Sequence, residues 1–193
     1  MTVREVAVEA YREALPALGA SLVGGLLAGV VLGGMRADLR SVPGLLVLVP
    51  ALLATRGNVY GSLGARLATG LHQGLIEPRV AAGDRRLRAA VAAALANGIV
   101  TSLFAAAAVV VILTTLGNPV ASLPRMLGIA LIAGLLSGVT LVAVVVTVVF
   151  AGYRRGHNPD TLVGPLVTTT GDVFGILFLL IAVRTVALVA GGG

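Results

Sequence analysis

The chain has 193 residues, of which 58% are hydrophobic and only 11% are charged, and its formal net charge is +6. This charged fraction is too small to coat a soluble domain of this length, so the composition indicates an integral membrane protein. The chain has no cysteine, which excludes disulfides and thiolate chemistry. Its basic residues are all arginines, and they lack the interleaved aromatic residues of a nucleic-acid-binding surface.

The predicted elements are a short charged lead-in followed by helices that span the membrane. We expect residues 1–14 to form a cytoplasmic amphipathic segment, because three glutamates recur there at four-residue spacing. We expect residues 15–190 to form a single all-α transmembrane domain with short connections. Its five predicted helices cover residues of about 15–35, 43–74, 87–116, 124–152 and 160–188. Counts of four or six are alternatives, because the second stretch is only half apolar.

The arginines segregate between the connections that five spans would place on opposite sides of the membrane. Eight of them share the side of the N-terminus: Arg4, Arg12, Arg79, Arg85, Arg86, Arg88, Arg154 and Arg155. Four of them fall on the opposite side: Arg36, Arg40, Arg125 and Arg184. Because arginine concentrates in cytoplasmic connections, this pattern predicts a cytoplasmic N-terminus and a C-terminus outside.

The second predicted helix carries a row of polar residues along one face, which we call the polar stripe. Its members recur at intervals of three or four residues: Thr55, Asn58, Ser62, Arg66, Thr69 and Gln73. A helix lying flat in the membrane interface is one interpretation of this pattern. However, the stripe continues from an apolar run that is too short to span alone, which favours a spanning helix with a polar face toward a wet interior.

The fifth predicted helix places a carboxylate, Asp172, among apolar residues about 12 positions from its start, or roughly 18 Å deep at 1.5 Å per residue. Thr168 lies one turn earlier on the same face, and Thr169 lies beside it. Pro165 lacks a backbone N–H and frees a carbonyl, while Gly171 permits close approach of backbone or ion. A carboxylate at this depth is costly, so it predicts a functional site.

Three roles for Asp172 follow from its surroundings. It could form a buried ion pair with Arg56 or Arg66, carry a proton, or bind a cation. Threonine hydroxyls, the Asn58 amide and carbonyls freed near proline and glycine are hard oxygen donors, which suit Mg²⁺, Ca²⁺ or Na⁺ and favour the third role. The two histidines, His72 and His157, are expected at the cytoplasmic interface rather than in a zinc site.

Two stretches resemble the MgtE magnesium-transporter family, most closely its eukaryotic solute-carrier branch. Residues 50–69, "PALLATRGNVYGSLGARLAT", resemble the signature of the family's second helix, including its Gly-Asn pair at Gly57 and Asn58. Residues 158–175, "NPDTLVGPLVTTTGDVFG", resemble the family's fifth-helix pattern, which ends in the Gly-Asp pair at Gly171 and Asp172. The two matches occur in the order that the family shows. The resemblance therefore extends over the whole predicted transmembrane domain.

The resemblance implies a pathway for Mg²⁺ or another divalent cation, lined by the second and fifth helices of a homodimer. It implies that Asp172 is the central ion-binding residue and that Asn58, Ser62 and Thr168 face the ion. Thr55, Gly57, Thr169, Gly171 and Arg66 would line or support the path. Arg56 departs from the small residues that the bacterial branch shows before Gly-Asn. The Mg²⁺-sensing cytosolic domains of bacterial members have no counterpart in these residues, so gating by such domains is expected to need a separate protein.

The alternative functions would use either the same site residues or none of them. A divalent cation exchanger coupled to Na⁺ or H⁺ would share the site, and a non-transporting structural membrane subunit would need no site. A membrane enzyme acting on lipid phosphates would need a cluster of catalytic groups at an interface, which the sequence does not supply. We therefore expect a transporter rather than an enzyme, with no cofactor, with the lipid bilayer as its surroundings, and with no nucleic-acid partner.

Overall fold

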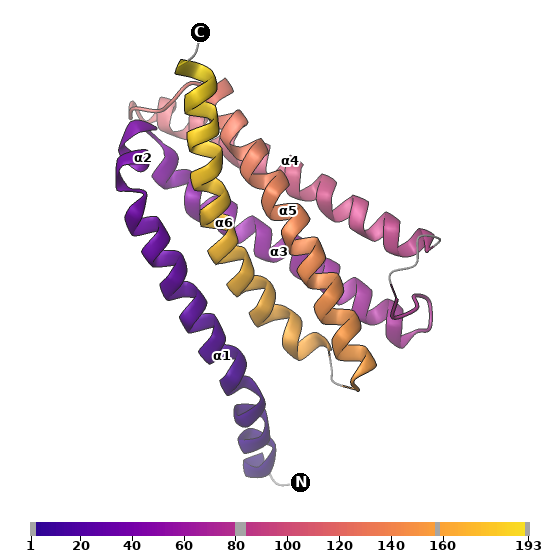
Figure 1. Ribbon diagram of the computed structural model, residues 1–193. Helices are drawn as coiled ribbons and strands as arrows, with labels where there is room; N and C mark the ends of the chain where they lie inside the picture. The colour runs from indigo at the N-terminus through magenta and orange to yellow at the C-terminus, as the bar shows by residue number, and fades with distance from the viewer. Residues whose placement is uncertain (1–2, 80–83, 157–158, 192–193) are drawn as a thin grey trace.

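The computed structural model describes residues 3–79, 84–156 and 159–191, so the interface expectation for His157 lies outside the described residues. The described residues are helical and contain no strand, which confirms the all-α prediction (Figure 1). The helices are α1 (Val3–Gly34), α2 (Arg36–Ser41), α3 (Leu45–His72), α4 (Arg85–Thr115), α5 (Leu123–Arg154) and α6 (Pro159–Gly191).

Among the described residues, four helices, α3 to α6, are long and apolar enough to cross a membrane. The polar half of the second predicted span belongs to one continuous helix, α3, which passes through Pro50 without a break. The first predicted span differs more, because α1 is a single helix from Val3 onward and does not separate from the charged lead-in. Its apolar part, Leu18–Gly34, is shorter than a standard span.

The long helices alternate in direction and give the molecule two ends (Figure 1). One end, which we call the α2 end, holds α2, the connection between α4 and α5, and the C-terminal part of α6. There the backbone N–H of Ala121 donates to the carbonyl of Pro43 at 2.9 Å, and Arg184 approaches Asp38 at 3.6 Å. These contacts tie the α2–α3 connection to the α4–α5 connection, and α2 to α6, at that end.

The opposite end holds the end of α3, the start of α4 and the end of α5, and we call it the α3–α4 end. The Tyr153 hydroxyl of α5 donates to the backbone carbonyl of Leu71 in α3 at 3.3 Å. The rings of Tyr153 and His72 meet edge to face with centroids 5.5 Å apart. At the start of α4, the Asp84 carboxylate accepts from the backbone N–H groups of Arg86 and Leu87, which caps the helix.

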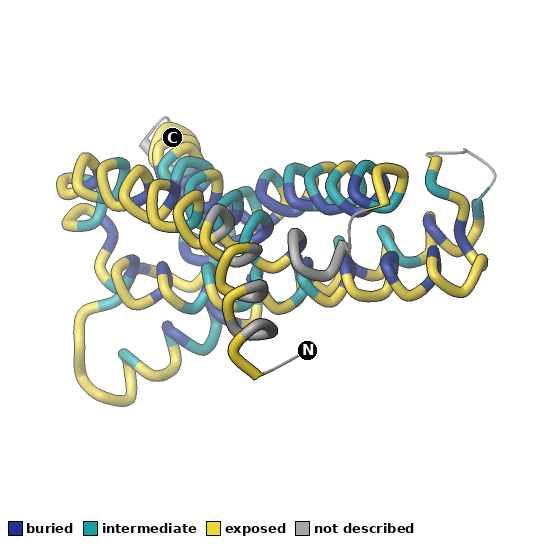
Figure 2. The backbone as a smooth tube through the Cα atoms, turned by 90° about the horizontal axis from the view of Figure 1, so that it is seen from below, coloured by how far each residue is buried: buried dark blue, intermediate teal, exposed yellow. Residues whose placement is uncertain are grey.

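The core lies where α5 packs against α3, α4 and α6. Buried apolar residues form two clusters along the bundle: one toward the α2 end around Leu48, Met126 and Leu179, and one toward the other end around Leu67 and Val145. In contrast, α1 packs mainly along α6, and most of its large side chains are exposed (Figure 2). The first helix is therefore an outer layer on a bundle built from α3 to α6.

Candidate cation-binding site

The polar stripe lies on the face of α3 that points away from the core. Residues such as Tyr60, Leu67 and Leu71 bury the opposite face against the other helices. Asn58 and Ser62 are exposed, as are the stripe residues that follow them toward the end of the helix. The helical period that makes one side of α3 apolar therefore turns its polar side out of the single chain.

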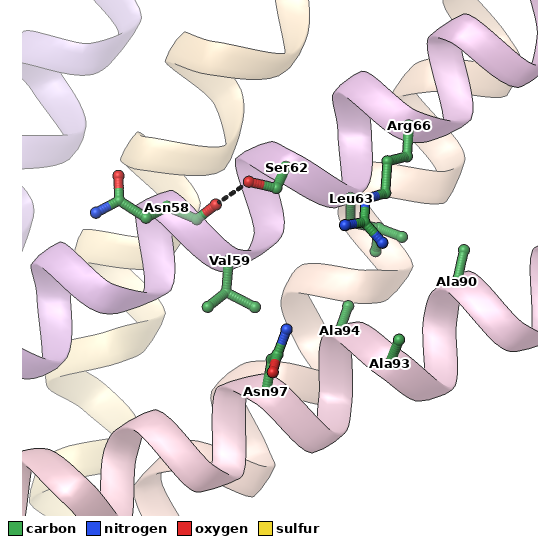
Figure 3. Close-up of a pocket in the computed structure, with 9 residues that line it drawn as sticks. All are labelled: Asn58, Val59, Ser62, Leu63, Arg66, Ala90, Ala93, Ala94 and Asn97. Carbon is green, nitrogen blue, oxygen red and sulfur yellow. Dashed lines mark hydrogen bonds between the residues drawn. The ribbon is translucent and has the colours of Figure 1, made fainter.

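The middle of the stripe borders a cavity of about 270 Å³ between α3 and α4 (Figure 3). Asn58, Ser62 and Arg66 line it from α3, and Asn97 lines it from α4. In Figure 3 the Asn97 amide points into the gap between the two helices, while the Asn58 amide points away from it. The Ser62 hydroxyl donates to the Asn58 carbonyl at 2.7 Å, which leaves its lone pairs available as acceptors.

A second cavity, of about 390 Å³, continues the polar surface toward the α3–α4 end. Arg66, Thr69 and Gln73 line it from the stripe, and Arg86 lines it from α4. Two guanidinium groups and two uncharged polar side chains thus border this second cavity. Five of the six stripe residues, all except Thr55, therefore line one of these two cavities.

Asp172 lies half-buried near the middle of α6. No hydrogen bond or ion pair to its carboxylate occurs among the residues that the structure describes. Thr168, one turn earlier, is exposed, and its hydroxyl donates to the backbone carbonyl of Gly164 at 2.9 Å. The carboxylate and the neighbouring hydroxyl are thus available to a ligand, but no contact in the described chain joins them to Asn58 or Ser62.

Thr169 is part of the contact between α6 and α1. Its hydroxyl lies 2.7 Å from the carbonyl of Pro165 and 2.9 Å from the hydroxyl of Ser21. A side chain on Gly24 of α1 would collide with the Thr169 methyl group, so the glycine permits this close approach. The glycines of the first predicted span suit close helix packing, and Gly24 is one of them. Sequence reasoning missed Ser21, although small polar residues such as serine are typical of contacts between membrane helices.

The remaining predicted residues are placed as follows. Thr55 is half-buried and donates to the carbonyl of Ala51 at 2.9 Å within its own helix. A Cβ atom added at Gly57 would have no neighbour within 4 Å, so this backbone is open to a partner or an ion. Gly171 is buried, and a Cβ atom there would lie 3.8 Å from the nearest Leu141 methyl group.

Arg56 points inward from α3 and is 97% buried, because only 3% of its surface is exposed. Its Nη1 lies against Gly175 of α6, and its Nε and Nη2 have no hydrogen-bond partner among the described residues. The ion pair considered from the sequence, between Asp172 and Arg56 or Arg66, is not formed within 4.0 Å in this structure. Sequence reasoning did not find the contact with α6, for which Gly175, three residues after Asp172, was the available signal.

One chain supplies one central carboxylate and uncharged oxygen donors. Within the described ranges, no group of three or more histidine, cysteine, aspartate or glutamate residues gathers to hold a metal. This donor set suits a hydrated hard cation rather than a tightly caged one, since Mg²⁺ keeps several waters and uses one or two carboxylates.

Residues 49–182 match the family model described as MgtE, divalent cation transporter. The chain belongs to the MgtE family. This confirms the resemblance seen in the second and fifth predicted helices. MgtE proteins are transporters and not enzymes, and the long apolar helices accord with a multi-pass protein of the cell membrane.

The curated relatives of this MgtE chain include solute carrier family 41 member 2 from Homo sapiens, Mus musculus and Gallus gallus. Each is 28% identical to the chain over 163 residues. The similarity covers 78% of this chain and 28% of the length of each relative. The chain therefore corresponds to little more than a quarter of these longer proteins, and it matches the eukaryotic branch that the sequence motifs indicated.

Proposed function

We propose that this MgtE chain transports divalent cations, chiefly Mg²⁺, along a path formed by α3 and α6 of two identical chains. Asp172 is the central ion-binding residue, and Asn58, Ser62 and Thr168 contact the waters of the ion. Gly57 and Gly171 let backbone approach the path. Thr55, Thr169 and Arg66 support its walls.

The observation that carries this proposal is the outward direction of the polar stripe. In an isolated chain, Asn58, Ser62 and Arg66 would contact lipid, and polar or charged side chains facing lipid are costly, by about 2.5–3.5 kcal/mol for a mid-membrane charge. A second chain that covers the stripe would replace lipid by a water-filled path. The stripe thus supports a homodimer in which each chain supplies half of the path.

In a dimer, one carboxylate from each chain is also sufficient to bind a divalent cation. Two Asp172 carboxylates near a common axis repel each other, and a divalent cation between them relieves that repulsion. The other groups are hydroxyl and amide oxygens, which hydrogen-bond to the waters of a hydrated ion. This arrangement suits Mg²⁺, which sheds water reluctantly and prefers octahedral oxygen coordination.

The fold supports five spans, with α1 as the fifth member of a single transmembrane domain over residues 15–190. The apolar part of α1, Leu18–Gly34, has 17 residues and would measure about 26 Å, close to the hydrocarbon thickness of about 30 Å. It packs along α6, which belongs to the family match. The arginine-rich α3–α4 end then faces the cytoplasm, together with residues 1–14, and the C-terminus lies outside.

Mg²⁺ uptake into liposomes that contain the purified chain tests this proposal. We expect Asp172→Asn to reduce the uptake rate to about one tenth of the wild-type rate or less, because the neutral amide removes the charge that attracts the cation. Glu77→Gln, which removes an exposed carboxylate at the α3–α4 end, is the matched control and should leave uptake unchanged.

Folded Asp172→Asn protein that transports Mg²⁺ at the wild-type rate would contradict the proposal. Repeating the assay with and without an imposed Na⁺ or pH gradient separates a passive path from a coupled exchanger. Uptake that requires one of these gradients would assign the site to an exchanger, and absence of any Mg²⁺ uptake would favour a structural subunit.

A further inference from the structure

A layer of buried polar side chains crosses the bundle midway between its two apolar clusters. It contains Arg56 of α3, Ser102 of α4 and Ser137 of α5, which are 3%, 1% and 1% exposed. Ser102 donates to the carbonyl of Gly98 at 2.7 Å, whereas the Ser137 hydroxyl has no partner among the described residues. Of these three residues, only Arg56 carries a charge, so it dominates the electrostatics of the layer.

The guanidinium of Arg56 occupies a space that a glycine of α6 leaves open. A Cβ atom added at Gly175 would lie 2.5 Å from Nη1 of Arg56 and 3.0 Å from a methyl carbon of Leu53. Any side chain at position 175 would displace the guanidinium. The contact between α3 and α6 is therefore built around this positive charge.

Gly175 follows Asp172 by three residues, which puts the two on neighbouring parts of one face of α6, about 4.5 Å apart along the axis. The charge of Arg56 thus lies within about one helical turn of the residue proposed to bind the ion. It does not approach the carboxylate within ion-pair distance, so both carboxylate oxygens stay available. Asp172 is also the one acidic residue in the sequence of α3 to α6 that does not lie near a helix end.

A buried guanidinium with two nitrogens lacking partners is unstable in a membrane unless a negative charge lies near it. The same holds for a half-buried carboxylate without a partner. Each charge lowers the free energy needed to bury the other, because they lie a short distance apart in an interior that screens charge poorly. A cation that enters the site meets the field of both charges and not of the carboxylate alone.

We propose that Arg56 is the resident counter-charge of the Asp172 site: it neutralises the carboxylate while the site is empty and weakens the binding of a divalent cation so that the ion can leave. This inference rests on the proposed function of Asp172. With Arg56, two chains bring two negative and two positive charges to the site. Without Arg56, two carboxylates face the cation uncompensated and hold it more tightly.

Mg²⁺ titration of the purified chain by calorimetry tests this role. We expect Arg56→Gln to bind Mg²⁺ at least about tenfold more tightly than the wild type, because a nearby repulsive charge is removed. Arg56→Lys keeps the charge and should stay within about threefold of the wild type. Arg184→Gln is the matched control, since it removes an exposed arginine 12 residues beyond Asp172 on α6, and it should change affinity by less than about twofold.

Unchanged or weaker Mg²⁺ binding by folded Arg56→Gln would overturn the inference. Arg56→Met, which retains the aliphatic volume, provides a second variant and should also bind more tightly. If neither variant folds, Arg56 is required for packing and the inference is equally overturned. Asp172→Asn separates the two proposals. Mg²⁺ binding that persists in Asp172→Asn contradicts the proposed function. Mg²⁺ binding that is lost in Asp172→Asn but unchanged in the Arg56 variants contradicts only this inference.

Discussion

At the residue scale, the clearest packing arrangement is the insertion of Tyr60 between two glycines. Its side chain is 1% exposed, and Cβ atoms added at Gly98 of α4 or at Gly138 of α5 would collide with its hydroxyl group. The glycines therefore allow three helices to meet around one aromatic ring. Small residues that let helices approach closely are a main source of helix association in membranes.

Gly98→Ala tests this packing. We expect it to destabilise the chain by about 1–3 kcal/mol, because the added methyl group overpacks the Tyr60 site and outweighs the better helix propensity of alanine. Gly33→Ala is the control, since a Cβ atom there would have no neighbour within 4 Å. Thermal unfolding in detergent should give a lower midpoint for Gly98→Ala and an unchanged or higher one for Gly33→Ala; equal midpoints would argue against the arrangement.

The sequence could predict which residues share a face but not what that face contacts. The spacing of the polar stripe follows from the helical period alone, and the structure keeps Asn58 and Ser62 on one side of α3. By contrast, the inward direction of Arg56 depends on space that Gly175 leaves on another helix. Likewise, the contact of Thr169 with Ser21 joins positions 148 residues apart, which no local pattern encodes.

At the element scale, hydropathy was sufficient to predict the helices of the core. The boundaries of α4 and α5 fall within about two residues of the predicted spans, because both helices are apolar along most of their length and end at polar connections. The start of the first helix was not predictable in the same way. Charged and apolar residues both form helices readily, so composition changes within α1 while the helix continues.

Whether α1 crosses the membrane can be tested with cysteine probes, because the native chain has none. We expect Ser41→Cys to react with a membrane-impermeant maleimide added to intact cells, because α1 would carry residue 41 to the outer side. Val3→Cys, exposed at the start of α1, should react only after permeabilisation. Labelling of both positions from the same side would show that α1 does not span, and inverted labelling would contradict the proposed orientation.

At the scale of the whole molecule, the single chain has the features of half of a transport path. Its polar stripe faces outward, its central carboxylate lacks a partner among the described residues, and its first helix covers only one flank of the bundle. The relatives that it matches are much longer than this chain. The sequence indicates the family and suggests which residues form the proposed site. The second chain that would complete this proposed site is not specified by any pattern within one chain.

Calorimetric titration of Mg²⁺ into the purified protein tests the central claim most directly, because it measures both affinity and stoichiometry. We expect wild-type protein to bind one Mg²⁺ per two chains at the central site, since two Asp172 carboxylates share one divalent ion. Asp172→Asn should abolish this binding while the protein stays folded and dimeric. Binding of one Mg²⁺ per chain, or wild-type binding by Asp172→Asn, would contradict the account.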